Sequence, residues 1–269
     1  MKVQLCLLAI LFVAGCVTQS QTNNTQQLPW PNSNPQQPFP NPSQQPSQPT
    51  TQSIDDGDTG SLNHGYLQAQ PYTKIIVEID YIQGYEPTSA TKTAISDFFQ
   101  NVAGKTVTFA GENVITPTKN TYTVNDIITT EKANRQHHTN GDTAVVYMMF
   151  LNGQFESPGA LGVTYKASSS VLFVERMNDA TSALILYSQI EKAVAIHELG
   201  HLMGLVNINY QSERDHEDSQ HPKHSNNENS VMFWAVEDIS LKNALNFGPP
   251  STFDNDDIFD LQKIRDGTY

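Results

Sequence analysis

The sequence predicts an α/β (α+β) domain built around a mixed, twisted β-sheet. Runs rich in isoleucine and valine, typical of strands, alternate over residues 72–203 with segments whose apolar residues recur every three or four positions, as in helices. This alternation is typical of a sheet with helices packed against it. The chain has only two cysteines, Cys6 and Cys16, so we expect no disulfide in the folded part.

The first half of the domain contains three predicted strands and one helix. Residues 72–83 form the first strand, and residues 87–104 form a helix that ends at Gly104. Residues 105–111 are the second strand. Residues 143–153 are a near-continuous apolar run, which predicts a central strand covered on both faces.

The second half predicts a strand pair, a long helix and a final helix. Residues 160–176 break near their middle, which indicates two strands joined by a turn. A helix is expected over 181–203, with Gly204 as its left-handed stop, and a polar loop follows over 207–229. Residues 253–267 predict a last helix, with acidic residues in its first turn.

The N-terminal part is not expected to belong to this domain. Residues 1–16 resemble a bacterial lipoprotein signal that ends in Val-Ala-Gly-Cys, which implies lipidation of Cys16; the alternative is an ordinary cleaved signal. Residues 17–53 have no charged side chain, eight prolines and ten glutamines, so we interpret 17–70 as a disordered tether. The folded domain is then 71–269, and we expect it to be extracytoplasmic and lipid-anchored to a cell membrane.

The composition limits the partners of the domain. The formal net charge of the chain is −13, which makes nucleic acid an unsuitable partner. Nothing in the sequence indicates an internal repeat, and we expect a monomer.

The motif that carries chemistry is His197-Glu198-Leu199-Gly200-His201 within the predicted helix 181–203. Residues three and four apart share a helix face, so the two imidazoles can bind one metal ion, and zinc accepts such ligands. Glu198 lies one position further round and can take a proton from a metal-activated water as general base, then return it as general acid. The alternative is a helix with two partly buried, hydrogen-bonded histidines.

Together with Gly204, this motif resembles the metzincin clan of zinc metalloproteases, whose pattern is H-E-x-x-H-x-x-G-x-x-H followed by a methionine turn. The sequence departs from it at Asn207, where the clan has its third histidine. The resemblance implies a metzincin-like twisted mixed sheet with an antiparallel edge strand, a long active-site helix and a Met-turn. It implies Met232 for the turn and residues 159–165 for an edge strand that pairs with an extended peptide.

Within the clan, the spacing after the helix is most similar to the archaemetzincins. His224 precedes Met232 by eight residues, as their third histidine does, while Ser225 and Ser230 replace their two cysteines. The resemblance therefore implies His224 as third ligand, delayed by 17 residues relative to Asn207. It also implies that a second zinc ion cannot be bound here through cysteines.

The third metal ligand stays open at the level of sequence. The loop offers His216, His221 and His224, of which His224 is favoured over His216, while Asn207 is a weak ligand for zinc. A solvated loop without function is the alternative. His137 and His138 lie far upstream and are expected at the surface.

These observations predict a membrane-anchored zinc metalloendopeptidase with Zn²⁺ as its cofactor and a protein or peptide substrate. One alternative is a non-catalytic zinc-binding surface lipoprotein, although storage of zinc would not require Glu198. Another is a degenerate protease fold that serves only in adhesion.

Overall fold

A computed structural model describes residues 53–116, 119–240 and 248–269. The expected signal segment, Cys16 and nearly all of the tether up to residue 53 lie outside the described residues. Within the described ranges, no helix combines the length and the apolar character needed to cross a membrane.

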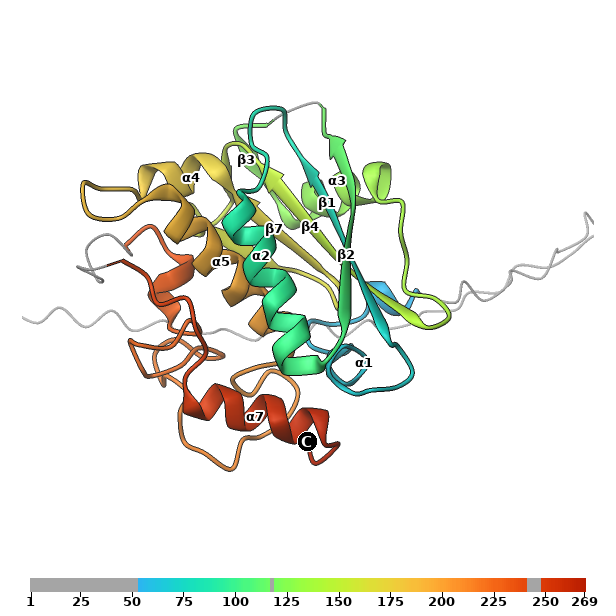
Figure 1. Cartoon of the computed structure of the whole chain (residues 1–269). Coiled ribbons are helices and arrows are strands. Elements are labelled where there is room, and N and C mark those ends of the chain that lie inside the picture. The colour runs from blue at the N-terminus through green and yellow to red at the C-terminus, as the bar shows by residue number, and fades with distance from the viewer. Residues whose placement is uncertain (1–52, 117–118, 241–247) are drawn as a thin grey trace, which may run out of the picture. The chain divides into compact units, whose positions relative to one another are not determined.

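The core of the fold is a five-stranded mixed sheet in the order β2-β1-β4-β7-β6 (Figure 1). Four strands are parallel, and β6 joins the edge antiparallel to β7. Each strand of this sheet overlaps a segment predicted to be extended, although β2 continues to Val114, beyond the predicted end at residue 111. The strands are β1 (Lys74–Tyr81), β2 (Thr106–Val114), β4 (Thr143–Leu151), β6 (Gly162–Thr164) and β7 (Ser169–Phe173), and a separate parallel pair is formed by β3 (Thr121–Tyr122) and β5 (Gln154–Phe155).

Strand β4 is buried on both faces, as its apolar run predicts. Val146, Met148 and Phe150 belong to the larger core cluster on one face, and Tyr147 and Met149 belong to a second cluster on the other. Because successive side chains of a strand point to opposite faces, one apolar run supplies both cores.

Helices cover both faces of the sheet. Helices α2 and α5 pack side by side on one face, and α3 lies on the other (Figure 1). The helix predicted from residue 181 begins later, at Tyr187, and neither α3 nor α4 was predicted. The helices are α1 (Asn63–Leu67), α2 (Ser89–Phe98), α3 (Val124–Asn134), α4 (Val174–Asp179), α5 (Tyr187–Leu202) and α7 (Asn255–Arg265), with 3-10 turns at Ile54–Asp56 and Trp234–Glu237 (η3) and a π turn at Phe99–Ala103.

The fold begins earlier than the residue 71 expected from the sequence. The side chains of Tyr66 and Leu67 in α1 are fully buried, and the Tyr66 hydroxyl donates to the Val145 carbonyl at 2.8 Å. Upstream, buried Asp55 lies 3.3 Å from the Arg135 guanidinium. The sequence of this segment is polar and contains few regularly spaced apolar residues, so it resembles the preceding tether. Its long-range contacts nevertheless make it part of the core.

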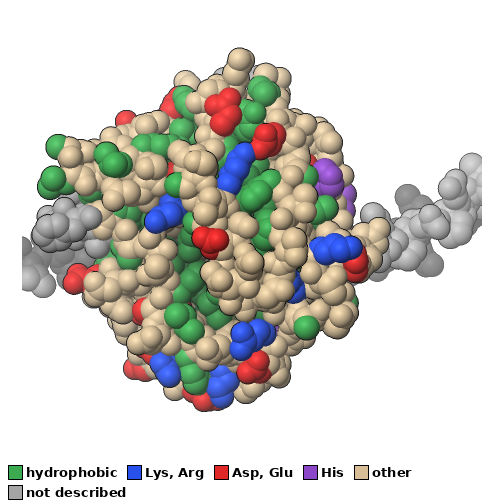
Figure 2. All heavy atoms as spheres, viewed as in Figure 1, with side chains coloured by type: hydrophobic (Ala, Val, Ile, Leu, Met, Phe, Trp, Pro, Cys, Tyr) green, Lys and Arg blue, Asp and Glu red, His purple; other side chains and the backbone are tan. Residues whose placement is uncertain are grey.

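Acidic and basic side chains are interspersed on the face shown in Figure 2, without a continuous basic patch on that face. This distribution is consistent with the net negative charge of the chain.

Candidate metal centre

Helix α5 contains the motif His197-Glu198-Leu199-Gly200-His201 and places it in the interior of the molecule. The side chains of His197 and Glu198 are fully buried, and His201 is 8% exposed. The helix ends at Leu202, and Gly204 follows in the left-handed conformation with φ of 79°. A Cβ at position 204 would lie 2.4 Å from the Asn209 side chain, so both the backbone angle and the packing favour glycine there.

The two helix histidines face one point, with ring centroids 4.7 Å apart. The Nδ1 of His197 lies 2.7 Å from the Val231 carbonyl oxygen, to which it can only donate. This bond fixes the tautomer and leaves the Nε2 lone pair free. Nε2 is buried and has no hydrogen-bond partner among the described residues, as expected of an atom that binds a metal ion.

The polar loop after α5 returns to bring His224 to the same point. The Asn207 amide donates to Glu217 at 2.8 Å, and Glu217 accepts the backbone N–H of Lys223 at 2.7 Å. The His224 ring lies 5.3 Å from that of His197 and 5.1 Å from that of His201, centroid to centroid. Nδ1 of His224 lies 3.1 Å from the Pro222 carbonyl oxygen, so Nε2 is again the free nitrogen.

A fourth side chain, Glu237 of η3, joins the three histidines. Ligand atoms of the four residues lie within 4.8 Å of one another. The Glu237 carboxylate is 2.9 Å from His224 Nε2, yet that nitrogen has no partner with hydrogen-bond geometry in the described part of the chain. Acceptor atoms that face each other at this distance repel unless a proton or a cation lies among them. The residues therefore fit a bound metal ion, and three imidazoles with a carboxylate form a donor set that zinc accepts.

Glu198 is held beside this group by the edge strand. The Thr164 hydroxyl donates to Oε2 of Glu198 at 2.7 Å, and it is in turn 2.8 Å from the Ser170 hydroxyl. The other oxygen, Oε1, is buried without a hydrogen-bond partner among the described residues. Gly162 makes room for it, because a Cβ there would lie 2.5 Å from Oε1. One carboxylate oxygen is thus fixed, and the other is free for chemistry.

Met232, which the resemblance to metzincins implies for the methionine turn, packs against the motif helix at Gly200. It is fully buried, and a Cβ on Gly200 would lie 2.2 Å from its sulfur. Glycine within the motif therefore lets the helix approach the turn closely.

Burial and neighbouring charges determine the protonation states of Glu198, His201 and Glu237. Burial raises the pKa of Glu198 well above its ordinary value, the Glu237 charge raises it further, and the Thr164 hydroxyl opposes this. Burial lowers the pKa of His201 well below its ordinary value, with the neighbouring imidazoles adding to the effect, so the imidazole of His201 is neutral. Burial alone would raise the pKa of Glu237, but the adjacent histidines lower it well below its ordinary value, so Glu237 is ionised.

The structure does not bring the remaining candidate ligands to this point. Buried His216 places Nε2 2.9 Å from Asp260 of α7, and the His221 ring stacks on Trp234 at 4.2 Å between centroids. The Asn207 amide is used at both ends, since its oxygen also accepts the Ser212 N–H at 2.7 Å. These residues shape the loop that positions His224.

The other histidines singled out in the sequence lie upstream and are partly exposed. Side-chain exposure is 36% for His137 and 59% for His138. Both imidazoles nevertheless reach buried acids, Glu78 at 3.1 Å and Asp55 at 3.2 Å.

The serines at the two cysteine positions of the archaemetzincin pattern are fully buried. The Ser230 hydroxyl hydrogen-bonds to Asp257 and accepts the N–H of Met232 at 2.8 Å, while the Ser225 N–H donates to the Met232 carbonyl at 2.8 Å. Hydrogen bonds to α7 and to the methionine turn therefore occupy this region.

A cleft of about 350 Å³ gives access to the metal centre. Its walls include Gly162, Thr164, His201, His224 and Glu237. Phe173 N–H donates to the Leu161 carbonyl and Tyr165 N–H to the Ser169 carbonyl, and this alternation turns the backbone groups of Gly162 and Thr164 toward the cleft rather than toward β7.

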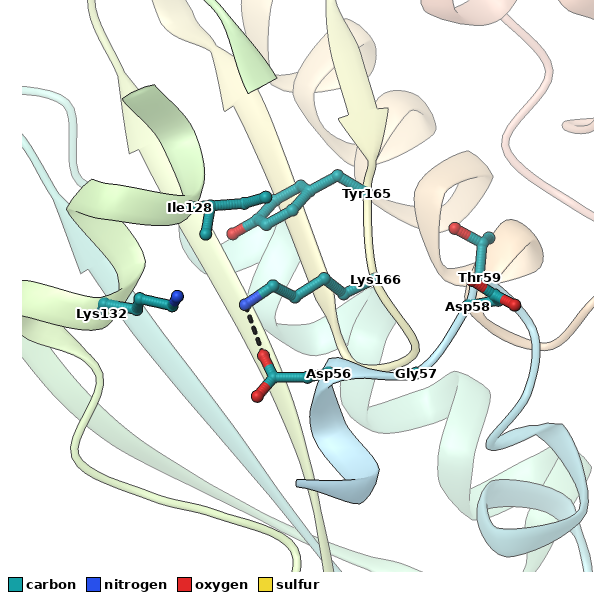
Figure 3. Close-up of a pocket in the computed structure, with 8 residues that line it drawn as sticks. All are labelled: Asp56, Gly57, Asp58, Thr59, Ile128, Lys132, Tyr165 and Lys166. Carbon is teal, nitrogen blue, oxygen red and sulfur yellow. Dashed lines mark hydrogen bonds and ion pairs between the residues drawn. The ribbon is translucent and has the colours of Figure 1, made fainter. Parts of the chain in front are cut away.

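A larger cavity of about 490 Å³ adjoins the cleft through Thr59 but contains none of the four metal-centre residues (Figure 3). Lys166 crosses it to an ion pair with Asp56 at 2.6 Å and also lies 2.8 Å from Glu131. These pairs hold the N-terminal segment against α3, so we assign this cavity a structural role.

Two residues of the site were not predicted from the sequence. Glu237 follows Met232 by five residues but matches no ligand spacing, and Thr164 was placed on the edge strand without a link to Glu198. An acid just after the methionine turn was the only signal available for Glu237.

No protein-family model matches the sequence, and no curated protein matches it. Among solved structures, the chain is similar to the archaemetzincin of Methanopyrus kandleri, with a TM-score of 0.50 and 16% identity, covering 71% of this chain and 96% of that one. It is also similar to the archaemetzincin of Archaeoglobus fulgidus complexed with malonate, with a TM-score of 0.40, 15% identity and coverage of 68% and 97%. A third match is a zinc-dependent peptidase from Methanocorpusculum labreanum, with a TM-score of 0.45, 15% identity and coverage of 69% and 99%. The first similarity confirms the expected metzincin-like fold class and, at this identity, shows the fold alone.

Proposed function

We propose that this chain is a zinc-dependent metalloendopeptidase that hydrolyses protein or peptide chains. The observation that carries the proposal is the free Oε1 of Glu198, buried beside three histidines whose ring nitrogens converge. A protein that only stored zinc would not need an oriented, unpartnered carboxylate at this place. His197, His201 and His224 are the proposed ligands, and His216 is not part of this set.

In the proposed hydrolysis, different residues of the chain have different roles. A zinc ion held by His197, His201 and His224 would acidify a water molecule and polarise the carbonyl of the scissile bond. Glu198 Oε1 accepts a proton from that water and later delivers it to the leaving amine, while Thr164 keeps Oε2 in place. The bond from His197 Nδ1 to the Val231 carbonyl keeps Nε2 free to bind the ion.

The edge strand orients the substrate. The backbone groups of Gly162 and Thr164 that face the cleft can pair with an extended peptide, as in strand addition. The cleft is open rather than enclosed, which suits a polypeptide rather than a small enclosed ligand.

The experiment uses the full-length protein, an unstructured protein as substrate, and the variant Glu198→Gln as matched control. Zinc-loaded wild type should cleave the substrate, a chelator should abolish cleavage, and added zinc should restore it. Glu198→Gln keeps the shape and the three ligands, so it should bind one zinc ion and lose about 10²- to 10⁴-fold in rate. Equal behaviour of wild type and variant would refute the peptidase, and zinc binding without cleavage would support a zinc-binding protein instead.

We also propose that lipid on Cys16 anchors the domain outside a cell membrane, on the strength of the sequence Val13-Ala14-Gly15-Cys16. The full chain should fractionate with membranes and incorporate labelled fatty acid. Cys16→Ser should lose the label and appear in the soluble fraction, and a variant that stays equally membrane-bound would contradict the anchor.

A further inference from the structure

We propose that Glu237 is a fourth, displaceable ligand that closes the metal centre until a peptide enters the cleft. The displacement by a peptide rests on the proposed peptidase function, whereas the ligand assignment rests on geometry alone.

The distances around Glu237 fit a shared ion. Its carboxylate oxygens lie 2.9 Å from His224 Nε2, 3.4 Å from His197 Nε2 and 3.9 Å from His201 Nε2. Ligand atoms at about 2.0–2.1 Å from a tetrahedral zinc ion are separated from one another by about 3.3–3.4 Å. The three distances scatter around this value, so Glu237 is close enough to the three imidazoles that it would bind an ion held by them.

A zinc ion with four protein ligands is typical of a structural site, whereas a catalytic site keeps one position open. One ligand must therefore leave before the chemistry can begin. The imidazoles of His197 and His224 are each tied to a backbone carbonyl through Nδ1. In the described part of the chain no backbone group holds the Glu237 carboxylate, and its side chain is 26% exposed on the cleft wall.

The backbone at Glu237 pairs with the residues that lead into the edge strand. The Leu161 N–H donates to the Glu237 carbonyl at 2.7 Å, and the Ile239 N–H donates to the Gly159 carbonyl at 2.8 Å. This short antiparallel pairing stops just before Gly162, the first residue of the edge strand that faces the cleft. An extended peptide on the edge strand therefore meets the Glu237 side chain, which can rotate away while its main chain stays in place.

If Glu237 is a displaceable ligand, its removal should change two binding affinities in opposite directions. Removing it weakens the binding of zinc, because one ligand is lost. Removing it also strengthens the binding of any small chelating ligand that needs the vacated position, because the competitor is gone. A carboxylate that only lined the cleft would produce neither effect.

The test measures zinc and acetohydroxamate binding to the full-length protein, with Glu237→Ala as the main variant. Zinc affinity is obtained by competition with a chromophoric chelator, and acetohydroxamate affinity by titration of the zinc-loaded protein. Glu237→Ala should weaken zinc binding by about tenfold or more and tighten acetohydroxamate binding, and Glu237→Gln should fall between it and wild type. Asp238→Asn removes one negative charge from the next residue and is the matched control, expected to resemble wild type.

The outcomes separate the two proposals. Weaker zinc binding with tighter acetohydroxamate binding supports the assignment, and it does so whether or not the protein cleaves peptides. Unchanged zinc affinity in Glu237→Ala, or an equal change in Asp238→Asn, overturns it. If the expected binding pattern appears while wild type and Glu237→Ala both fail to cleave any peptide, the peptidase is refuted and the ligand assignment stands.

Discussion

The hydroxyl of Thr164 offers the sharpest test of how the site works. Thr164→Val preserves the shape of the side chain but removes the donor that lies 2.7 Å from Glu198 Oε2. A hydrogen bond to a charged group contributes about 1.5–3 kcal/mol. Because about 1.4 kcal/mol corresponds to a factor of ten in rate, the variant should lose about 10- to 150-fold in kcat.

The assay is steady-state cleavage of a peptide by zinc-loaded protein, with zinc content measured in parallel. The loss should fall on kcat rather than KM, because Thr164 acts through Glu198, and zinc content should not change. Thr164→Ser retains a hydroxyl and should recover most of the rate. An unaffected kcat in Thr164→Val, or an equal loss in Thr164→Ser, would show that this bond does not position the base.

Three further predictions concern the fold around the site. A chain that begins at Pro71 lacks the buried side chains of α1 and should lose at least about 3 kcal/mol of stability, seen as a lower urea midpoint than that of a chain beginning at residue 53; equal midpoints would contradict the contacts described. Gly200→Ala would place a Cβ 2.2 Å from the Met232 sulfur and should lower the free energy of unfolding by about 1–3 kcal/mol, so an unchanged value would argue against the close approach. Burial lowers the pKa of His216, but Asp260 and its acidic neighbours raise it to a net value above 6.5. The stability from this pair is therefore fully present below pH 6.5 and is lost as the pH rises through the folded pKa, so the difference between wild type and His216→Gln in urea unfolding should shrink over that range. Loss of zinc from His216→Gln would instead indicate a metal ligand.

Local patterns in the sequence predicted a large part of this fold. The apolar run 143–153 became a strand buried on both faces, and the spacing of His197 and His201 put both imidazoles on one face of a helix. Such features are predictable because strand and helix periodicity is a property of neighbouring residues. Helix α3 was not predicted because Ile127 and Glu131 are its only buried residues, which leaves little apolar periodicity.

The sequence by itself determined the helix with its two histidines and Glu198, and the resemblance of its spacing to a known pattern pointed to His224. Only the tertiary structure decided which loop histidine reaches the helix, that His216 pairs with Asp260 instead, and that Thr164 and Glu237 meet at the same place. The physical reason is the range of the contacts. Thr164 and Glu198 are 34 residues apart and His216 and Asp260 are 44 apart, and no periodicity links positions that only the packing of the sheet, the loop and α7 brings together.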